Sequence, residues 1–232
     1  EDKSTVFEEI QRLSEENLDS FDVSEKIRLW QALGRSFLRL GAPEQARDLW
    51  ARAVALTPFN LTHQRDLFDL ERAVDHQWSA QLTPAVAADE AQRITAEHNK
   101  QMANLRKIVN NIRAIEGPGG VNGNLTEAFL LLSEVDFRKR QLSNDRAAAN
   151  EDDIKQKALD ARRLLIEVEP KMPRHAQIPN ALGTIEQLLG NDDAAISHFL
   201  RAFNMGDMSP STVNQLVPLL AKHHRNEEVS AI

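Results

Sequence analysis

Apolar residues recur at intervals of three and four along most of the chain, and no stretch alternates apolar and polar residues with the period of two typical of strands. Glycine and proline number nine each and fall between the periodic segments. This pattern predicts an all-α protein whose helices are joined by short turns. The expected helices cover residues 4–18, 24–40, 43–56, 60–79, 84–116, 124–148, 151–169, 176–190, 192–205 and 209–223.

Three of these helices carry capping residues at their expected starts. Thr83 and Ser209 each precede a proline, which places a hydroxyl cap before a proline at the first helical position. Asn124 is followed three residues later by Glu127, an arrangement that resembles a capping box. We therefore expect helices to begin directly after these three residues.

The clearest break in the pattern is the glycine-rich stretch GPGGVNGN, residues 117–124. Its glycines have high backbone entropy and its proline lacks a backbone donor, so a helix cannot continue through it. We predict two domains: N-terminal helical repeats over residues 1–116, ending in a long helix, and C-terminal degenerate helical repeats over residues 124–232. The stretch is either a hinge between two packed halves or a long turn.

Residues 27–58, IRLWQALGRSFLRLGAPEQARDLWARAVALTP, place small and large residues at the spacing that two crossing antiparallel helices require. Glycine and alanine stand where the backbones would approach, and tryptophan, leucine and phenylalanine fill the space between them. A proline then ends the second helix. The eight positions are Trp30, Leu33, Gly34, Phe37, Ala46, Trp50, Ala53 and Pro58.

This segment resembles a tetratricopeptide repeat, with Phe37 in place of the usual tyrosine. Residues 176–209 resemble a second, degenerate repeat in which Pro179 replaces the tryptophan, Glu186 the aromatic residue and Asp207 the proline. A third pair is expected to open after it. The resemblance implies a tetratricopeptide-like α-solenoid of antiparallel helix pairs, because one repeat cannot bury its apolar face alone.

The helix expected over residues 84–116 departs from the family, because at about 1.5 Å per residue it would be nearly twice the usual length. Its apolar stripe has heptad-like spacing. The stripe comprises Ala91, Ile94, His98, Leu105, Ile108, Ile112 and Ile115, interrupted by Gln101 and Met102. It either packs on the helices 60–79 and 124–148 of the same chain, or forms a projecting coiled coil or a dimer seam.

In this family the first helix of each pair lines a concave groove, and its second, fifth, ninth and thirteenth positions face the ligand. The resemblance therefore implies a partner-binding site made of Arg28, Gln31, Arg35, Arg39, Arg65 and Arg72. Because the planar arginine fork makes paired hydrogen bonds to carboxylates, we expect an acidic or C-terminal peptide as the ligand. The alternative is a solvated face with weak surface salt bridges. The two-carboxylate clamp of chaperone-binding members uses lysine and asparagine where Gln31 and Arg35 stand, so that function is not predicted.

The charge balance, 28 basic against 35 acidic residues, gives a net charge of −7. A chain of this kind has no overall attraction to nucleic acid or to an anionic membrane surface. No apolar run approaches the roughly 20 residues that span a bilayer, so membrane insertion is not expected. The chain begins at Glu1 and ends on Ile232 without a helix-stop signal, which is typical of a segment of a longer protein.

The sequence offers little evidence for a catalytic, metal-binding or phosphate-binding site. Cysteine is absent, and no two histidines have the spacing that puts two metal ligands on one helix face. The glycine-rich stretch lacks the lysine of a phosphate-binding loop. Paired aspartates at 152–153 and 192–193 stand at expected helix starts, where they favour the helix dipole. We predict no catalytic residue, cofactor or metal, and a scaffold or adaptor that binds a protein or peptide. The alternatives are a homo-oligomerisation domain that uses the helix 84–116, and an accessory domain of a larger protein.

Overall fold

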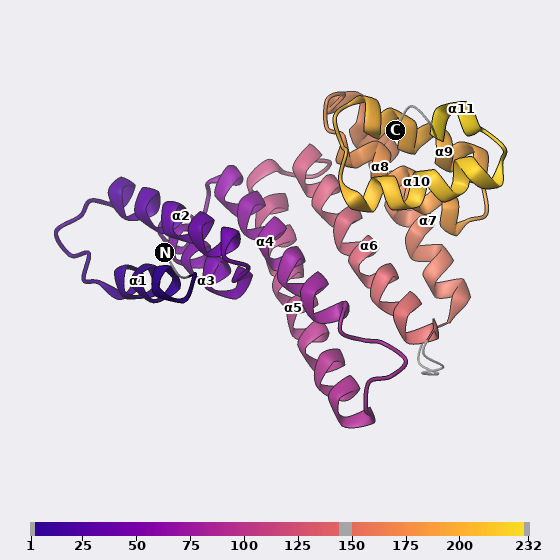
Figure 1. Ribbon diagram of the computed structural model, residues 1–232. Helices are drawn as coiled ribbons and strands as arrows, with labels where there is room; N and C mark the ends of the chain where they lie inside the picture. Colours follow the sequence, from indigo (N-terminus) through magenta and orange to yellow (C-terminus); the bar gives the residue numbers. More distant parts are fainter. Residues whose placement is uncertain (1–2, 144–149, 230–232) are drawn as a thin grey trace. The chain divides into compact units, whose positions relative to one another are not determined.

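The computed structural model describes residues 3–143 and 150–229, and all regular structure within these ranges is helical (Figure 1). In chain order the elements are α1 (Lys3–Glu15), α2 (Val23–Arg39), α3 (Pro43–Leu56), α4 (Leu61–Ser79), α5 (Ala88–Glu116), α6 (Val121–Ser143), α7 (Glu151–Val168), the 3₁₀ turn η1 (Glu169–Lys171), α8 (Gln177–Leu188), α9 (Asp192–Asn204), α10 (Pro210–Lys222) and α11 (Asn226–Val229). Helices adjacent in the sequence pack in pairs. The predicted fold class, all-α with solenoid-like helix pairs and one long helix, is confirmed.

Each of the ten predicted helices is present, but two of the three predicted starts are wrong. Ser209 caps α10 as expected, accepting a hydrogen bond from the Thr212 amide. Thr83 does not cap α5, which begins five residues later at Ala88. Instead the Val86 amide donates to the Thr83 carbonyl at 3.2 Å, so the proline after Thr83 occupies a turn, a position that also suits its fixed φ.

The start of α6 is also displaced, because its cap comes from the preceding helix. The Glu116 carboxylate at the end of α5 accepts the Gly123 amide at 2.9 Å and the Asn122 side-chain amide at 2.5 Å. The helix therefore begins at Val121, and Asn124 lies inside it instead of capping it. Residues 144–148 of the helix expected over 124–148 lie outside the described residues.

The described residues form two compact units, one comprising residues 3–126 with 143 and the other residues 127–142 with 150–229. The division falls within α6, a few residues after the glycine-rich stretch. In the first unit, α3 packs on both α2 and α4, and α5 packs along α4. In the second unit, α8 packs on α7 and on α9, and α9 on α10.

The α2–α3 pair closes around one glycine. A Cβ atom added at Gly34 would lie 2.1 Å from Cζ3 of Trp50, so the indole ring rests directly on the α2 backbone. Trp50 is 4% exposed, and Phe37 and Ala46 beside it are fully buried, whereas Trp30 is half-buried. Phe37 also receives Phe7 of α1 edge-on, at 5.4 Å between ring centres.

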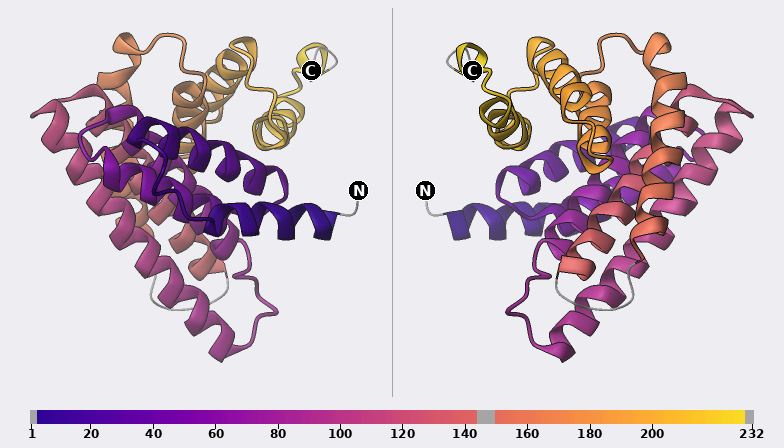
Figure 2. Two further views of the ribbon diagram at one scale, coloured as in Figure 1. Left: turned by 90° about the vertical axis from the view of Figure 1, so that its left-hand side faces the viewer. Right: turned by 90° about the vertical axis from the view of Figure 1, so that its right-hand side faces the viewer.

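The α4–α5 pair consists of two long helices that lie side by side in every view (Figures 1 and 2). The apolar stripe predicted for the long helix is buried within the chain. Ile115 is half-buried, and the buried positions of α5 are Ala91, Ile94, His98, Gln101, Met102, Leu105, Ile108, Val109 and Ile112. Of the two alternatives for this stripe, its burial agrees with packing inside the same chain.

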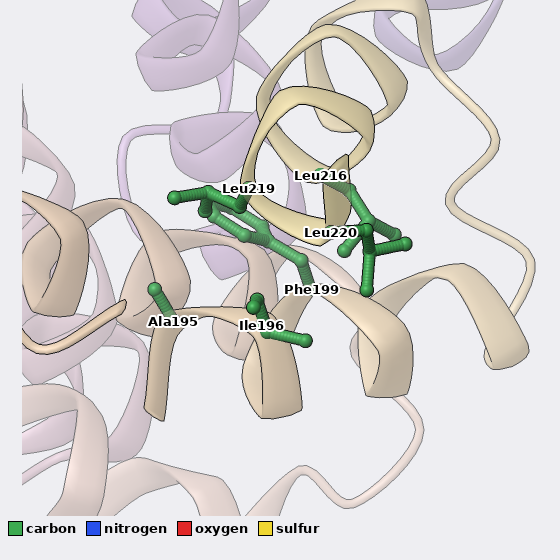
Figure 3. Close-up of a cluster of buried hydrophobic side chains, with 6 residues drawn as sticks. All are labelled: Ala195, Ile196, Phe199, Leu216, Leu219 and Leu220. Carbon is green, nitrogen blue, oxygen red and sulfur yellow. The ribbon is translucent and has the colours of Figure 1, made fainter. Parts of the chain in front are cut away.

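The α8–α9 pair in the second unit repeats the glycine contact. A Cβ atom added at Gly183 would lie 2.7 Å from Cδ1 of Phe199, and the two residues are sixteen apart, as Gly34 and Trp50 are. Phe199 also belongs to a buried cluster that joins α9 to α10 (Figure 3). The cluster comprises Ala195, Ile196, Phe199, Leu216, Leu219 and Leu220.

Four helix connections share one turn. In each, the amide of a residue after the first helix donates to a carbonyl five residues earlier, as in a Schellman motif. These bonds run from Ala42 to Phe37 at 2.9 Å, from Asn191 to Glu186 at 2.8 Å, from Asp207 to Ala202 at 3.0 Å, and from Arg225 to Leu220 at 2.9 Å. The residue before each donor has positive φ: Gly41 at 78°, Gly190 at 81°, Gly206 at 96° and His224 at 58°. The connection between α10 and α11 thus has the geometry of the other three although it lacks glycine.

We expect Gly34→Ala to lower the free energy of unfolding by about 1–3 kcal/mol, because the added methyl group would overlap the Trp50 ring. Gly183→Ala should have a similar effect through Phe199. Chemical denaturation measures both. In a Trp50→Leu background the cost of Gly34→Ala should fall, and purely additive effects of the two substitutions would contradict the contact.

Candidate functional site

Four of the six predicted binding residues lie on α2, whose orientation is fixed at its start and along its buried face. Asp22 accepts the Glu25 amide at 2.8 Å, and the Glu25 carboxylate accepts the Asp22 amide at 2.9 Å, which completes a capping box. Apolar residues and Gly34 turn one face of α2 into the unit. The opposite face is therefore directed to solvent.

The exposed side of α2 carries Arg28, Arg35 and Arg39, which we call the arginine face. They are seven and four residues apart, so their Cα atoms follow one stripe with spacings of about 10 and about 6 Å. None of the three has an ion pair or side-chain hydrogen bond with another described residue. Gln31 lies beside this stripe and is half-buried. The arginine face is thus a row of exposed positive charges with donors available to a ligand.

The two remaining predicted residues lie on α4 and differ from the first four. Arg65 is half-buried. The side chain of Arg72 is 28% exposed, lies 5.9 Å from the centre of the Phe68 ring and pairs with Asp69 at 3.9 Å. Burial lowers the pKa of the Arg72 guanidinium, while Asp69 and Asp75 act in the opposite direction. Arg72 therefore contributes to packing within the first unit.

The packing partners of α2 are α1 and α3, whereas those of α4 are α3 and α5. The two sets of arginines are therefore linked through α3 and not by extended packing of α2 on α4. A single groove that contains all six predicted residues stays a prediction.

The corresponding positions on α8 form contacts inside the second unit. The Asn180 side-chain amide donates to Asp207 at 2.6 Å and to Thr212 at 2.5 Å. The Thr184 hydroxyl donates to Gln215 at 3.2 Å. These polar groups join α8 to α10 and to the turn before it, so they are largely used within the chain.

Asp75 of α4 and His98 of α5 form a buried polar pair that the sequence pattern does not predict. The pattern instead places His98 in the apolar stripe of the long helix. The Asp75 and His98 side chains lie 2.6 Å apart and are 4% and 5% exposed. The Ser79 hydroxyl points to Asp75 at 3.5 Å. Catalysis by a serine requires the serine beside the histidine. Here the serine contacts the aspartate and all three groups are buried, which fits a structural network.

Glu71 is a second buried polar group on α4, with 6% exposure. Burial raises the pKa of its carboxyl group, against the opposing effects of Arg47 and of a hydrogen bond with Asn104. Its Oε2 atom has no hydrogen-bond partner among the described residues. The charged groups that act on it belong to α3 and α5, so Glu71 lies where these two helices approach α4.

The remaining candidate chemistry is structural in character. His63 bonds the Thr57 hydroxyl at 2.7 Å, and His223 bonds Asp192 at 3.1 Å. The paired aspartates lie in the first turns of α7 and α9, as predicted. Within residues 3–143 and 150–229 there is no group of three side chains suited to a metal ion. In the same ranges no helix is both long and apolar enough to cross a membrane.

Comparison with known proteins adds no relative: no protein-family model and no curated protein matches the chain.

Glu71→Gln should raise the free energy of unfolding at neutral pH. A carboxyl group whose pKa is raised by folding is destabilising when ionised, so the cost is absent below the ordinary glutamate pKa and grows as the pH rises through the folded-state pKa. Urea denaturation from pH 4 to pH 8 measures the difference between the two proteins. Equal stability of wild type and variant at pH 8 would contradict the assignment, and Glu167→Gln on the exposed side of α7 serves as the control.

Proposed function

We propose that the chain is a protein-interaction module of the tetratricopeptide type, and that the arginine face of α2 binds an acidic segment of a partner protein. The observation that carries the proposal is the row of three exposed arginines with no ion pair inside the described part of the chain. Protein surfaces usually intersperse charges of both signs. The arginine face is a row of positive charges on a protein whose net charge is −7, so it differs from the rest of the surface. Such a row favours binding of an anionic ligand.

The repeat character rests on more than the sequence motif. The Gly34–Trp50 contact recurs as Gly183–Phe199 with the same separation. The turns after Glu186 and Leu220 are 34 residues apart, which is the length of a tetratricopeptide repeat. These regularities support the family proposal, and with it the general role of such repeats in holding other proteins.

The chemistry of the face indicates what the bound segment contains. Guanidinium groups form charge-assisted, two-pronged hydrogen bonds with carboxylates. An extended peptide advances about 3.3 Å per residue, so carboxylates three and then two residues apart would follow the spacings of about 10 and about 6 Å along α2. The proposed ligand is therefore an acidic segment with carboxylates at these intervals.

Charge reversal at Arg35 and Arg39 tests the function. Protein captured by the wild-type chain is identified, and its acidic segments are synthesised as labelled peptides for titration by fluorescence anisotropy. We expect the Arg35→Glu, Arg39→Glu variant to bind such a peptide at least about tenfold more weakly, because both attractive contacts become repulsive.

A matched control carries the same change in net charge elsewhere. Lys171 and Arg174 are exposed in the second unit, and their reversal to glutamate should leave the peptide affinity unchanged. Equal affinity of the wild type and the Arg35, Arg39 variant would reject the arginine face as the binding site. Replacing the peptide's glutamates by glutamine should weaken binding as the protein variant does.

A further inference from the structure

The outward face of α1 has the opposite charge to the arginine face. Glu8, Glu9 and Glu15 are exposed on α1 with Arg12 among them, and Glu16, also exposed, follows directly after its end. The inward face of α1 is fixed by the Phe7–Phe37 contact. Its C-terminal end is held by Arg52, which donates to the Ser14 carbonyl at 3.1 Å.

These opposite charges do not meet within one chain. The glutamates of α1 and the arginines of α2 are all exposed, so both sets face solvent. Among the described residues no ion pair joins the two sets. Both sets are therefore available to charges of the opposite sign on another molecule.

The spacing of the two sets matches. Glu8 and Glu15 are seven residues apart on α1, as Arg28 and Arg35 are on α2, and seven residues correspond to about 10 Å along a helix. An apolar side chain flanks the arginine face, since Leu38 is 40% exposed and lies three residues after Arg35 on α2. Covering this side chain would add apolar burial to the ion pairs.

We propose that the arginine face is occupied by α1 of a second copy of this chain. In this dimer a two-fold axis runs parallel to α1 and α2. It places α1 of each copy against α2 of the other copy, and the two helices run in antiparallel directions. Glu15 then lies opposite Arg28, and Glu8 opposite Arg35. The contact is isologous, so both acidic faces and both arginine faces are paired in one closed dimer.

This self-pairing is independent of the proposed function but uses the same surface. A dimer formed in this way covers Arg28 and Arg35, so self-pairing and binding of an acidic partner exclude each other. Affinity for an acidic peptide is therefore expected to fall as the chain concentration rises. The dimer differs from one built on the long helix, whose apolar stripe is buried in the chain.

Sedimentation equilibrium with two complementary charge-reversed chains tests the pairing. One chain carries Arg28→Glu and Arg35→Glu, and the other carries Glu8→Arg and Glu15→Arg. We expect the wild type to dimerise in about 0.05 M NaCl and to dissociate in about 1 M NaCl, where charge interactions are screened. Each variant alone should dimerise at least about tenfold more weakly, because like charges face each other.

An equimolar mixture of the two variants gives the decisive result. In the mixed dimer one half of the contact keeps the wild-type charges and the other half pairs the two reversed sets, so the mixture should form a heterodimer with an affinity close to that of the wild type. Circular dichroism checks that each variant is helical, and Arg28→Gln with Arg35→Gln replaces the first variant if reversal disrupts folding. The chain reversed at Lys171 and Arg174 should dimerise as the wild type does.

Three outcomes would overturn the proposal: a wild type that stays monomeric up to about 100 µM at low salt, variants that dimerise as well as the wild type, or a mixture without heterodimer. None of these bears on the peptide titration, in which the chain is kept dilute. A monomer that still binds the acidic peptide through Arg35 and Arg39 would reject self-pairing and retain the proposed function.

Discussion

The structure depends on the contact between an aromatic ring and a backbone that has no side chain in its way. Where two helices cross, the ring of the second helix lies directly on the glycine of the first, as Trp50 does on Gly34 and Phe199 on Gly183. This contact sets the distance between the paired helices and hence which residues face inward. The outward direction of Arg28, Arg35 and Arg39 is its consequence, because these arginines occupy the opposite side of the same helix.

Much of this arrangement was readable from the sequence, because the determinants are local. The crossing residues fall at fixed intervals, and Ser209 caps its own helix within one turn. The prediction failed where a cap or a turn depended on a residue outside the expected pattern. Glu116 supplies the cap of α6 from the preceding helix, and the proline after Thr83 forms a turn instead of starting α5.

The site was predictable in part for the same reason. The exposure of the α2 arginines follows from helical periodicity once the inward face is known. Burial on α4 depends on side chains from α3 and α5, so the half-buried state of Arg72 and the position of Glu71 could not be inferred from their own neighbourhood. The Asp75–His98 pair joins residues 23 apart, and no local pattern distinguishes it from an apolar contact.

The histidine at position 224 has a consequence for the order in which the helices come apart. A left-handed backbone conformation is unfavourable for any residue with a side chain, by about 1 kcal/mol relative to glycine. The turn before α11 therefore has a less favourable local free energy than the glycine-containing turns after α2 and α8. Because local opening starts where the local free energy is least favourable, the amide protons of α11, a helix of four residues, exchange with solvent before those of α8 and α9.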